Sequence, residues 1–296
     1  MNSLILIGDA RQRLAELPAG SARTCVTSPP YFGLRDYGVG GQIGLEDTPD
    51  AYVAEMVALF REVWRVLADD GTLWLNIGDS YAGNNSGEGL KPKDLIGIPW
   101  RVAFALQADG WYLRSDIIWH KPNPMPESVT DRPTKSHEYL FLLTKSPRYY
   151  YDHEAIKEDA VTNIGEAKIR FGGSKYGDSD DPKHATKSGN VYEPSGKRNK
   201  RDVWTINTKP FRGAHFAVMP EALVEPCVLA GSAEGDTVLD PFTGSGTVAV
   251  VANRHGRNFV GTELNSEYAQ IAYERITNDS PMLNTVEVNQ TRKENQ

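Results

Sequence analysis

Two patterns of apolar and polar residues alternate along the chain. Short apolar runs have the length of buried β-strands, and longer segments place apolar residues every three or four positions, as amphipathic helices do. The predicted strands span residues 4–7, 24–27, 72–77, 116–119, 139–143, 238–240 and 258–261. The predicted helices span residues 50–67, 96–108, 247–253 and 267–276. This alternation predicts an α/β fold in which a mainly parallel sheet carries helices on both faces.

One stretch departs from both patterns. Between about residues 156 and 199 the chain is rich in Gly, Ser, Lys, Asp and Asn, and its apolar residues are too sparse to define an element. We therefore expect residues 1–152 and 206–278 to form the two halves of one domain, with an insertion at 153–205. The last residues, 279–296, are polar, and we expect a frayed tail there.

Composition and charge narrow the class of protein. The chain has 296 residues, two cysteines in no CxxC pattern and a formal net charge of −7. We expect neither a disulfide scaffold nor a metal site, and the apolar start is too short for a signal peptide or a membrane span. This favours a soluble, cytoplasmic protein. The acidic balance disfavours a general nucleic-acid coat protein, yet residues 166–201 hold nine Lys or Arg against five Asp or Glu.

A glycine-rich turn follows a predicted strand near the end of the chain. The strand ends at Asp240, the turn contains Gly244 and Gly246, and a helix begins at about Thr247. Small residues allow a ligand close to the backbone, and the first turn of a helix offers free N–H groups. Glu263 stands 19 positions after Gly244, the offset of a carboxylate that binds ribose hydroxyls. The alternative is a tight turn with a helix-capping threonine, and the turn lacks the GK[ST] of a P-loop.

The carboxylate before this turn bears on the identity of the ligand. A negative charge at the strand tip favours a cationic ligand group over a phosphate, because like charges repel. An adenosyl sulfonium that carries an α-amino group is such a ligand. The candidate cofactor-binding residues of this region are Asp240, Pro241, Phe242, Gly244, Ser245, Gly246, Thr247 and Glu263.

A second turn, Ser28-Pro29-Pro30-Tyr31, ends the predicted strand at 24–27. Two prolines fix the backbone, so the Ser28 hydroxyl and the Pro29 carbonyl point in defined directions. These two acceptors and the ring of Tyr31 suit a planar group that bears an NH₂. A rigid strand exit with a core tyrosine is the alternative. The place of the turn at the carboxyl end of a strand, together with the sulfonium-type pocket, favours methylation of an amino group.

With these two turns the sequence resembles the β-class DNA amino-methyltransferases, which use S-adenosyl-L-methionine to methylate cytosine N4 or adenine N6. TSPPY is similar to the family's catalytic motif and DPFTGSGT to its cofactor motif, and their order in the chain is the permuted order of the class. Three further segments match the family: Ile7-Gly8-Asp9, residues 116–129 with His137-Glu138, and His215-Phe216-Ala217 with Pro220.

The resemblance implies a Rossmann-like, circularly permuted class I methyltransferase fold that acts on double-stranded DNA. Residues 1–152 would form its catalytic half, residues 206–278 its cofactor-binding half, and residues 153–205 a target-recognition insertion.

The resemblance also implies roles for single residues. Ser28 Oγ and the Pro29 carbonyl would accept the two amine hydrogens of a flipped base, Tyr31 would stack on that base, and the methyl group would move by direct in-line transfer. Asp240 would hold the methionine amino group and Glu263 the ribose hydroxyls. Further cofactor-binding candidates are Asp9, His215 and Phe216, and candidates for contact with the target base or DNA are Arg35, Trp119, Lys121, Lys197, Arg198, Lys200 and Arg201.

The target base and the class of substrate stay open at this point. Ser28 at the first motif position favours cytosine N4, because the adenine enzymes of the family lean to Asp there, and adenine N6 remains the alternative. A nicotinamide-dependent oxidoreductase would use the same glycine turn, but it gives no reason for the Ser-Pro-Pro-Tyr turn. A non-catalytic DNA-binding module needs no cofactor pocket. The same chemistry on RNA or protein amides is typical of Asn-Pro-Pro-Tyr, and Ser28 argues against it. Two glycine-rich loops, 32–44 and 81–89, are expected to fold over DNA or the flipped base.

Overall fold

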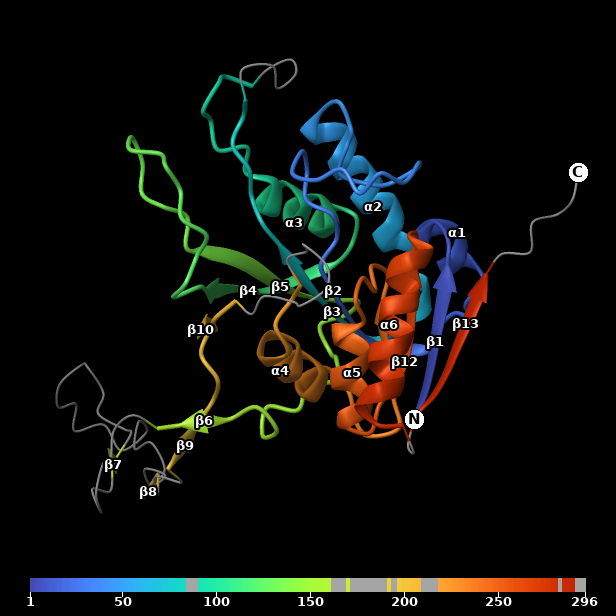
Figure 1. Cartoon of the computed structure of the whole chain (residues 1–296). Helices are drawn as coiled ribbons and strands as arrows, with labels where there is room; N and C mark the ends of the chain where they lie inside the picture. Colours follow the sequence, from blue (N-terminus) through green and yellow to red (C-terminus); the bar gives the residue numbers. More distant parts are fainter. Residues whose placement is uncertain are drawn as a thin grey trace, which may run out of the picture. The chain divides into compact units, whose positions relative to one another are not determined.

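The structure is a computed structural model of the chain (Figure 1), and it describes residues 1–83, 90–160, 169–170, 191–192, 196–208, 218–281 and 284–290. It contains two compact units, one made of Met1–Asp152 with Arg201–Gln296 and the other of His153–Lys200. Within the described ranges, none of the helices combines the length and the apolar character that crossing a membrane requires.

A nine-stranded sheet forms the centre of the first unit. Its strands are β1 (Asn2–Ile7), β2 (Ala22–Thr27), β3 (Leu67–Ile77), β4 (Tyr112–His120), β5 (His137–Thr144), β10 (Val203–Thr205), β11 (Thr237–Asp240), β12 (Asn258–Glu263) and β13 (Thr285–Gln290). Their order across the sheet is β10-β4-β5-β3-β2-β11-β12-β1-β13. Strand β5 runs antiparallel to β3 and β4, and every other pair of neighbours is parallel.

Helices cover both faces of this sheet (Figure 1). They are α1 (Ala10–Ala15), α2 (Pro49–Val66), α3 (Ile98–Ala108), α4 (Glu221–Gly231), α5 (Thr247–Arg254) and α6 (Ser266–Asp279). Side chains of α1, α2 and α3 share one core with Cys25 and Leu73. The preceding strand residues, Thr24 and Thr72, face the opposite way and lie against Gly231 of α4. The predicted α/β fold, a mainly parallel sheet between two layers of helices, is confirmed.

The last strand differs from the expectation of a frayed tail at 279–296. Helix α6 continues to Asp279, and β13 then pairs in parallel with β1 along the whole of that strand. Its sequence, TVEVNQ, alternates apolar and polar residues, as an edge strand with one covered face does. Helices α1 and α4 and strand β10 were not predicted from the sequence either. Strand β10 pairs with β4 in the main sheet, so the chain re-enters the first unit at Arg201, before the expected end of the insertion at residue 205.

The second unit contains two small antiparallel ladders. Strand β6 (Glu158–Asp159) pairs with β9 (Lys197–Arg198), and β7 (Ile169–Arg170) pairs with β8 (Val191–Tyr192). Within the first ladder, Arg198 Nε donates to Glu158 Oε1 at 2.9 Å. Most of the basic stretch at 166–201 lies outside the described residues.

Four adjacent parallel strands position the candidate site. Strands β2, β11, β12 and β1 are consecutive neighbours, so their carboxyl ends meet at one edge of the sheet. Ser28 follows the first of these strands, the second and third end at Asp240 and Glu263, and Asp9 comes two residues after the last. Open α/β sheets bind ligands at this edge.

Candidate active site

A pocket of about 430 Å³ runs along the carboxyl edge of the sheet. It brings together fifteen of the residues that the sequence analysis named from distant parts of the chain. They are Asp9, Ser28, Pro29, Pro30, Tyr31, Arg35, Trp119, Lys121, Asp240, Pro241, Phe242, Gly244, Ser245, Thr247 and Glu263.

The other candidates fall into three groups. Gly246 is not among the described residues that line the pocket, and a Cβ there would meet Ala272 of α6. His215 and Phe216 lie outside the described residues. The four basic candidates are not among the described residues that line the pocket: Lys197, Arg198 and Lys200 belong to the second unit, and Arg201 begins the returning segment of the first.

Glu263 ties the glycine turn to the end of β12. Its Oε2 accepts the Gly244 N–H at 2.8 Å, and its Oε1 accepts the Asn265 N–H at 2.9 Å. Burial raises the pKa of the Glu263 carboxyl, against the effect of these backbone donors. Each carboxylate oxygen carries a second lone pair, so the residue is fixed in place and retains capacity to accept ligand hydroxyls. Asp9, which also lines the pocket, caps α1, and hydrogen bonds from Arg11 lower the pKa of its carboxyl.

Asp240 is almost fully buried at the tip of β11. Its Oδ1 accepts the Thr27 hydroxyl at 2.7 Å and the Phe242 N–H at 3.0 Å, which links β2 to the glycine turn. Burial raises the pKa of Asp240 to about 7, although both hydrogen bonds oppose the shift. A carboxylate that is costly to ionise when alone is well suited to receive a cation, because the cation restores its charged form.

This shift predicts a pH dependence of cofactor affinity. If the ionised form of Asp240 receives an ammonium group, binding lowers its pKa below about 7. Affinity for S-adenosyl-L-methionine should then fall as the pH drops below about 7, by up to tenfold per pH unit, because one proton must leave on binding. Calorimetric titration between about pH 5.5 and 7.5 measures this slope. Asp240→Asn should bind weakly with a flat profile, and a flat profile in the wild type would contradict the assignment.

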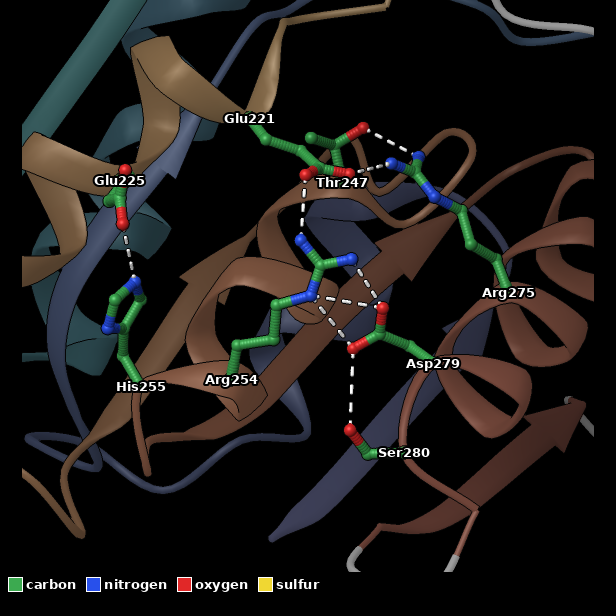
Figure 2. A network of polar contacts seen from close by, with 8 residues as sticks. All are labelled: Glu221, Glu225, Thr247, Arg254, His255, Arg275, Asp279 and Ser280. Atoms are coloured by element: carbon green, nitrogen blue, oxygen red, sulfur yellow. Dashed lines mark hydrogen bonds and ion pairs between the residues drawn. The ribbon is translucent and has the colours of Figure 1, made fainter.

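The glycine turn is supported from behind by α6 (Figure 2). A Cβ at Gly246, where φ is +79°, would lie 3.0 Å from the Cβ of Ala272, so the turn and the helix are in close contact. Arg275 of α6 donates to Thr247 Oγ1 at 2.8 Å and to Glu221 of α4 at 3.0 Å. A second arginine, Arg254 of α5, bridges the same glutamate to the end of α6 (Figure 2). These ion pairs fix the three helices that carry the cofactor side of the site.

The catalytic turn is held by a network around one tyrosine. Ser28 Oγ donates to the Tyr31 hydroxyl at 3.3 Å, and that hydroxyl donates to Glu138 Oε2 at 2.7 Å. Glu138 lies at the start of β5, so the antiparallel strand brings a carboxylate to the carboxyl edge of its neighbours. Burial, and next the charge of Glu138, raises the pKa of Tyr31 well above its usual value, so the phenol stays protonated. The Pro30 carbonyl accepts from the buried hydroxyl of Tyr52 at 2.8 Å.

Glu138 accepts hydrogen bonds from two further side chains that line the pocket. Asn76, near the end of β3, donates through Nδ2 to Glu138 Oε2 at 3.2 Å. Lys121 forms a hydrogen-bonded ion pair with Glu138, and its Nζ lies 4.3 Å from the centre of the Trp119 ring. The Trp119 indole N–H donates to the Ile206 carbonyl at 2.9 Å. This part of the pocket lining therefore has an aromatic ring, a cation and a carboxylate held by one another and by Ile206.

The ring of Tyr31 packs on the backbone after β3, which gives a testable prediction. A Cβ at Gly78 would lie 2.6 Å from Tyr31 Cε2, so Gly78→Ala must push the ring away and disturb its bond to Glu138. We expect the rate of methyl transfer to fall about tenfold, because small misplacements of positioning groups are costly. Single-turnover kinetics measures the effect. Ser21→Ala is the control, since Ser21 is exposed and is not among the pocket-lining residues, and equal rates for both variants would refute the role of this contact.

Residues of the loop at 32–44 form part of the pocket lining. The Gly33 N–H donates to the Gly44 carbonyl at 2.8 Å, so the loop returns to the catalytic turn that it leaves. Arg35 and Tyr37 of this loop line the pocket with Tyr268 of α6. The expectation that this loop covers the flipped base or DNA stays a prediction. The loop at 81–89 lies largely outside the described residues.

The fold and this pocket define a class I methyltransferase domain with its motifs in permuted order. A family model described as DNA methylase, of the N6/N4 methyltransferases, matches residues 22–274. M.Cfr9I of Citrobacter freundii, named a Type II methyltransferase, is 52% identical over 91% of this chain and 86% of its own length. M.SmaI of Serratia marcescens, also so named, is 53% identical over 92% and 90%. The chain belongs to the N6/N4 DNA methylase family.

A solved structure agrees with this assignment. TTHA0409 of Thermus thermophilus, solved in complex with S-adenosyl-L-methionine, is 26% identical, covers 97% of this chain and 99% of its own, and superposes with a TM-score of 0.64. The cofactor of this family, and of this chain, is S-adenosyl-L-methionine. The buried carboxylates, the glycine turn and the size of the pocket fit that ligand, whereas a nicotinamide-dependent oxidoreductase is no longer a candidate.

Proposed function

We propose that the chain is a Type II DNA methyltransferase that methylates N4 of cytosine in double-stranded DNA. The observation that carries this proposal is the Ser28 hydroxyl, which lies on the pocket wall and donates to Tyr31. With its proton so engaged, the oxygen keeps its lone pairs for an amine hydrogen. Serine at the first position of this turn is typical of cytosine-N4 motifs. The Type II assignment is supported by M.Cfr9I and M.SmaI, which this chain matches over most of its length.

The cofactor end of the pocket supports roles for three acidic residues. S-Adenosyl-L-methionine supplies an electrophilic methyl group when it is bound. Asp240 receives the methionine amino group, and Glu263, already held by the Gly244 N–H, accepts the ribose hydroxyls. Asp9 contributes a carboxylate near the adenine. Gly244 keeps the pocket side of the turn free of a side chain, so that the ligand approaches closely, whereas Gly246 allows the close contact of the turn with α6.

The catalytic end acts by positioning rather than by covalent catalysis. Ser28 Oγ and the Pro29 carbonyl each accept one amine hydrogen, which favours a pyramidal nitrogen with its lone pair toward the methyl group. Tyr31, Trp119 and Lys121 hold the flipped base. Neither cysteine is among the described residues that line the pocket, and burial raises the pKa of Cys25 well above its usual value. This supports direct transfer without a thiolate nucleophile.

Contacts with the DNA backbone are assigned to the basic residues at the end of the insertion. Lys197, Arg198, Lys200 and Arg201 lie within five consecutive positions, which supports a phosphate-binding segment. Arg198 forms an ion pair with Glu158, so binding a DNA phosphate would require Arg198 to give up this carboxylate for the phosphate.

A labelled-transfer assay tests both the reaction and the base. The protein is incubated with methyl-tritiated S-adenosyl-L-methionine and DNA from a methylation-deficient host, and the nucleosides of the product are separated and identified by mass spectrometry. Label in N4-methylcytosine is the expected result. Label in N6-methyladenine would keep the reaction class and overturn the assignment of the base. Binding of the cofactor without transfer to DNA would overturn the proposed substrate in favour of RNA or protein.

A further inference from the structure

Met125 is the most exposed large apolar side chain of the described residues, at 85%. It lines the same pocket as Trp119, Lys121 and the catalytic turn, so an apolar side chain stands in solvent at the pocket mouth. A lone exposed apolar residue is common on protein surfaces and carries no meaning by itself. Its place at the entrance to the reaction site and its rigid backbone distinguish this one.

The segment that carries Met125 is fixed by its own prolines and by hydrogen bonds to a neighbouring segment. Prolines stand at positions 122, 124 and 126, and each restricts the backbone. Asn123 Nδ2 donates to the Thr208 carbonyl at 3.1 Å, and the Thr208 N–H donates back to Asn123 Oδ1 at 3.0 Å. Thr208 follows β10, and the Ile206 N–H donates to the His120 carbonyl of β4 at 3.0 Å. The segment is thus fastened to the edge of the central sheet.

A methionine that is exposed on such a fixed segment contributes little packing energy to the fold of this chain. Ordering it on a partner costs only its side-chain entropy, because the surrounding backbone is already fixed. Its length and lack of branching suit a narrow apolar gap. The substrate of the proposed function contains such a gap, because a base that enters the pocket leaves an empty place in the DNA stack.

We propose that Met125 is a wedge that enters the base stack of duplex DNA and fills the place of the extruded target base. The inference rests on the proposed function, since it requires a base taken out of a duplex. Apolar side chains, methionine among them, enter base steps in other DNA-binding proteins and offset the cost of unstacking. The wedge stabilises the extruded state and takes no part in the transfer of the methyl group.

The test compares two duplexes that carry the sequence mapped from the methylated product DNA. In one the target base is paired, and in the other it faces an abasic site, so that extrusion no longer breaks a base pair. Single-turnover rates are measured with saturating S-adenosyl-L-methionine for the wild type, Met125→Ala and Met125→Leu. Val129→Ala is the matched control, because Val129 is exposed in the same segment and is not among the pocket-lining residues.

We expect Met125→Ala to lose about tenfold in rate on the paired duplex, equivalent to about 1.4 kcal/mol, and less than about threefold on the abasic duplex. Met125→Leu and Val129→Ala should stay within about twofold of the wild type on both. The wedge is refuted by an unchanged rate for Met125→Ala on the paired duplex, or by an equal loss on both duplexes, which would indicate contact with the base inside the pocket. An equal loss in Val129→Ala would also refute it. Absence of transfer by the wild type would instead contradict the proposed function.

Discussion

Ser28→Ala is expected to lower the rate of methyl transfer to DNA about 100-fold, while the affinity for S-adenosyl-L-methionine stays unchanged. The hydroxyl lies on the pocket wall, and the hydrogen bond that it donates to Tyr31, at 3.3 Å, is long. Its removal therefore disturbs the turn little, because two prolines and the Tyr52 bond to the Pro30 carbonyl still fix the backbone. What is lost is the acceptor that orients one amine hydrogen, an interaction needed when the nitrogen becomes pyramidal.

Single-turnover kinetics and calorimetric titration of the cofactor separate the two effects. Ser21→Ala is the matched control, since it removes the same atom from an exposed serine whose hydroxyl donates to the Pro18 carbonyl. A Ser28→Ala variant with a wild-type rate would refute the role of the hydroxyl. A variant that also loses cofactor affinity would show that the serine shapes the whole pocket rather than the amine site.

The sequence predicts those parts of the site in which a functional side chain lies at, or directly after, the end of a strand. Asp240 and Glu263 end buried strands, and Ser28 follows one, so each is placed by a local pattern of apolar run and turn. Parallel order then brings strand ends together without further information, because every such end lies at one edge of the sheet. For this reason most of the cofactor turn and the whole catalytic turn fall in one pocket.

The parts that the sequence does not predict depend on pairing between distant segments. His137-Glu138 belongs to a segment that resembles the family, but the resemblance does not name the partners of Glu138, which come from three separate parts of the chain. Locally, Glu138 is only a charged residue at the start of the apolar run of β5. Arg275 is similar, because its contact with Thr247 exists only once α6 packs behind the turn. Strands β10 and β13 were missed because short edge strands carry few apolar residues.

Glu138→Ala is expected to affect both stability and rate. The substitution leaves the Lys121 ammonium, whose side chain is 17% exposed, without its carboxylate, and it removes the nearer acceptor of the Tyr31 hydroxyl, which keeps the 3.3 Å bond to Asn76 Oδ1. We expect the free energy of unfolding to fall by about 3 kcal/mol, the typical cost of one unpaired charge in a buried pair. The rate should fall about 100-fold, because Tyr31 and through it Ser28 lose their fixed positions. Urea unfolding and single-turnover kinetics measure the two effects.

A double-mutant cycle separates these two roles of Glu138. Lys121→Ala combined with Glu138→Ala removes both charges. The loss of unfolding free energy in the double variant should therefore be smaller than the sum of the two single losses by about 2 kcal/mol. Its rate should remain as low as that of Glu138→Ala, since the Tyr31 hydroxyl still lacks its 2.7 Å bond to Glu138. Additive effects on stability would show that Lys121 and Glu138 do not interact in solution. If the rate recovered together with the stability, the loss in Glu138→Ala would come from a disturbed fold, and the tyrosine network would have no part in positioning the amine.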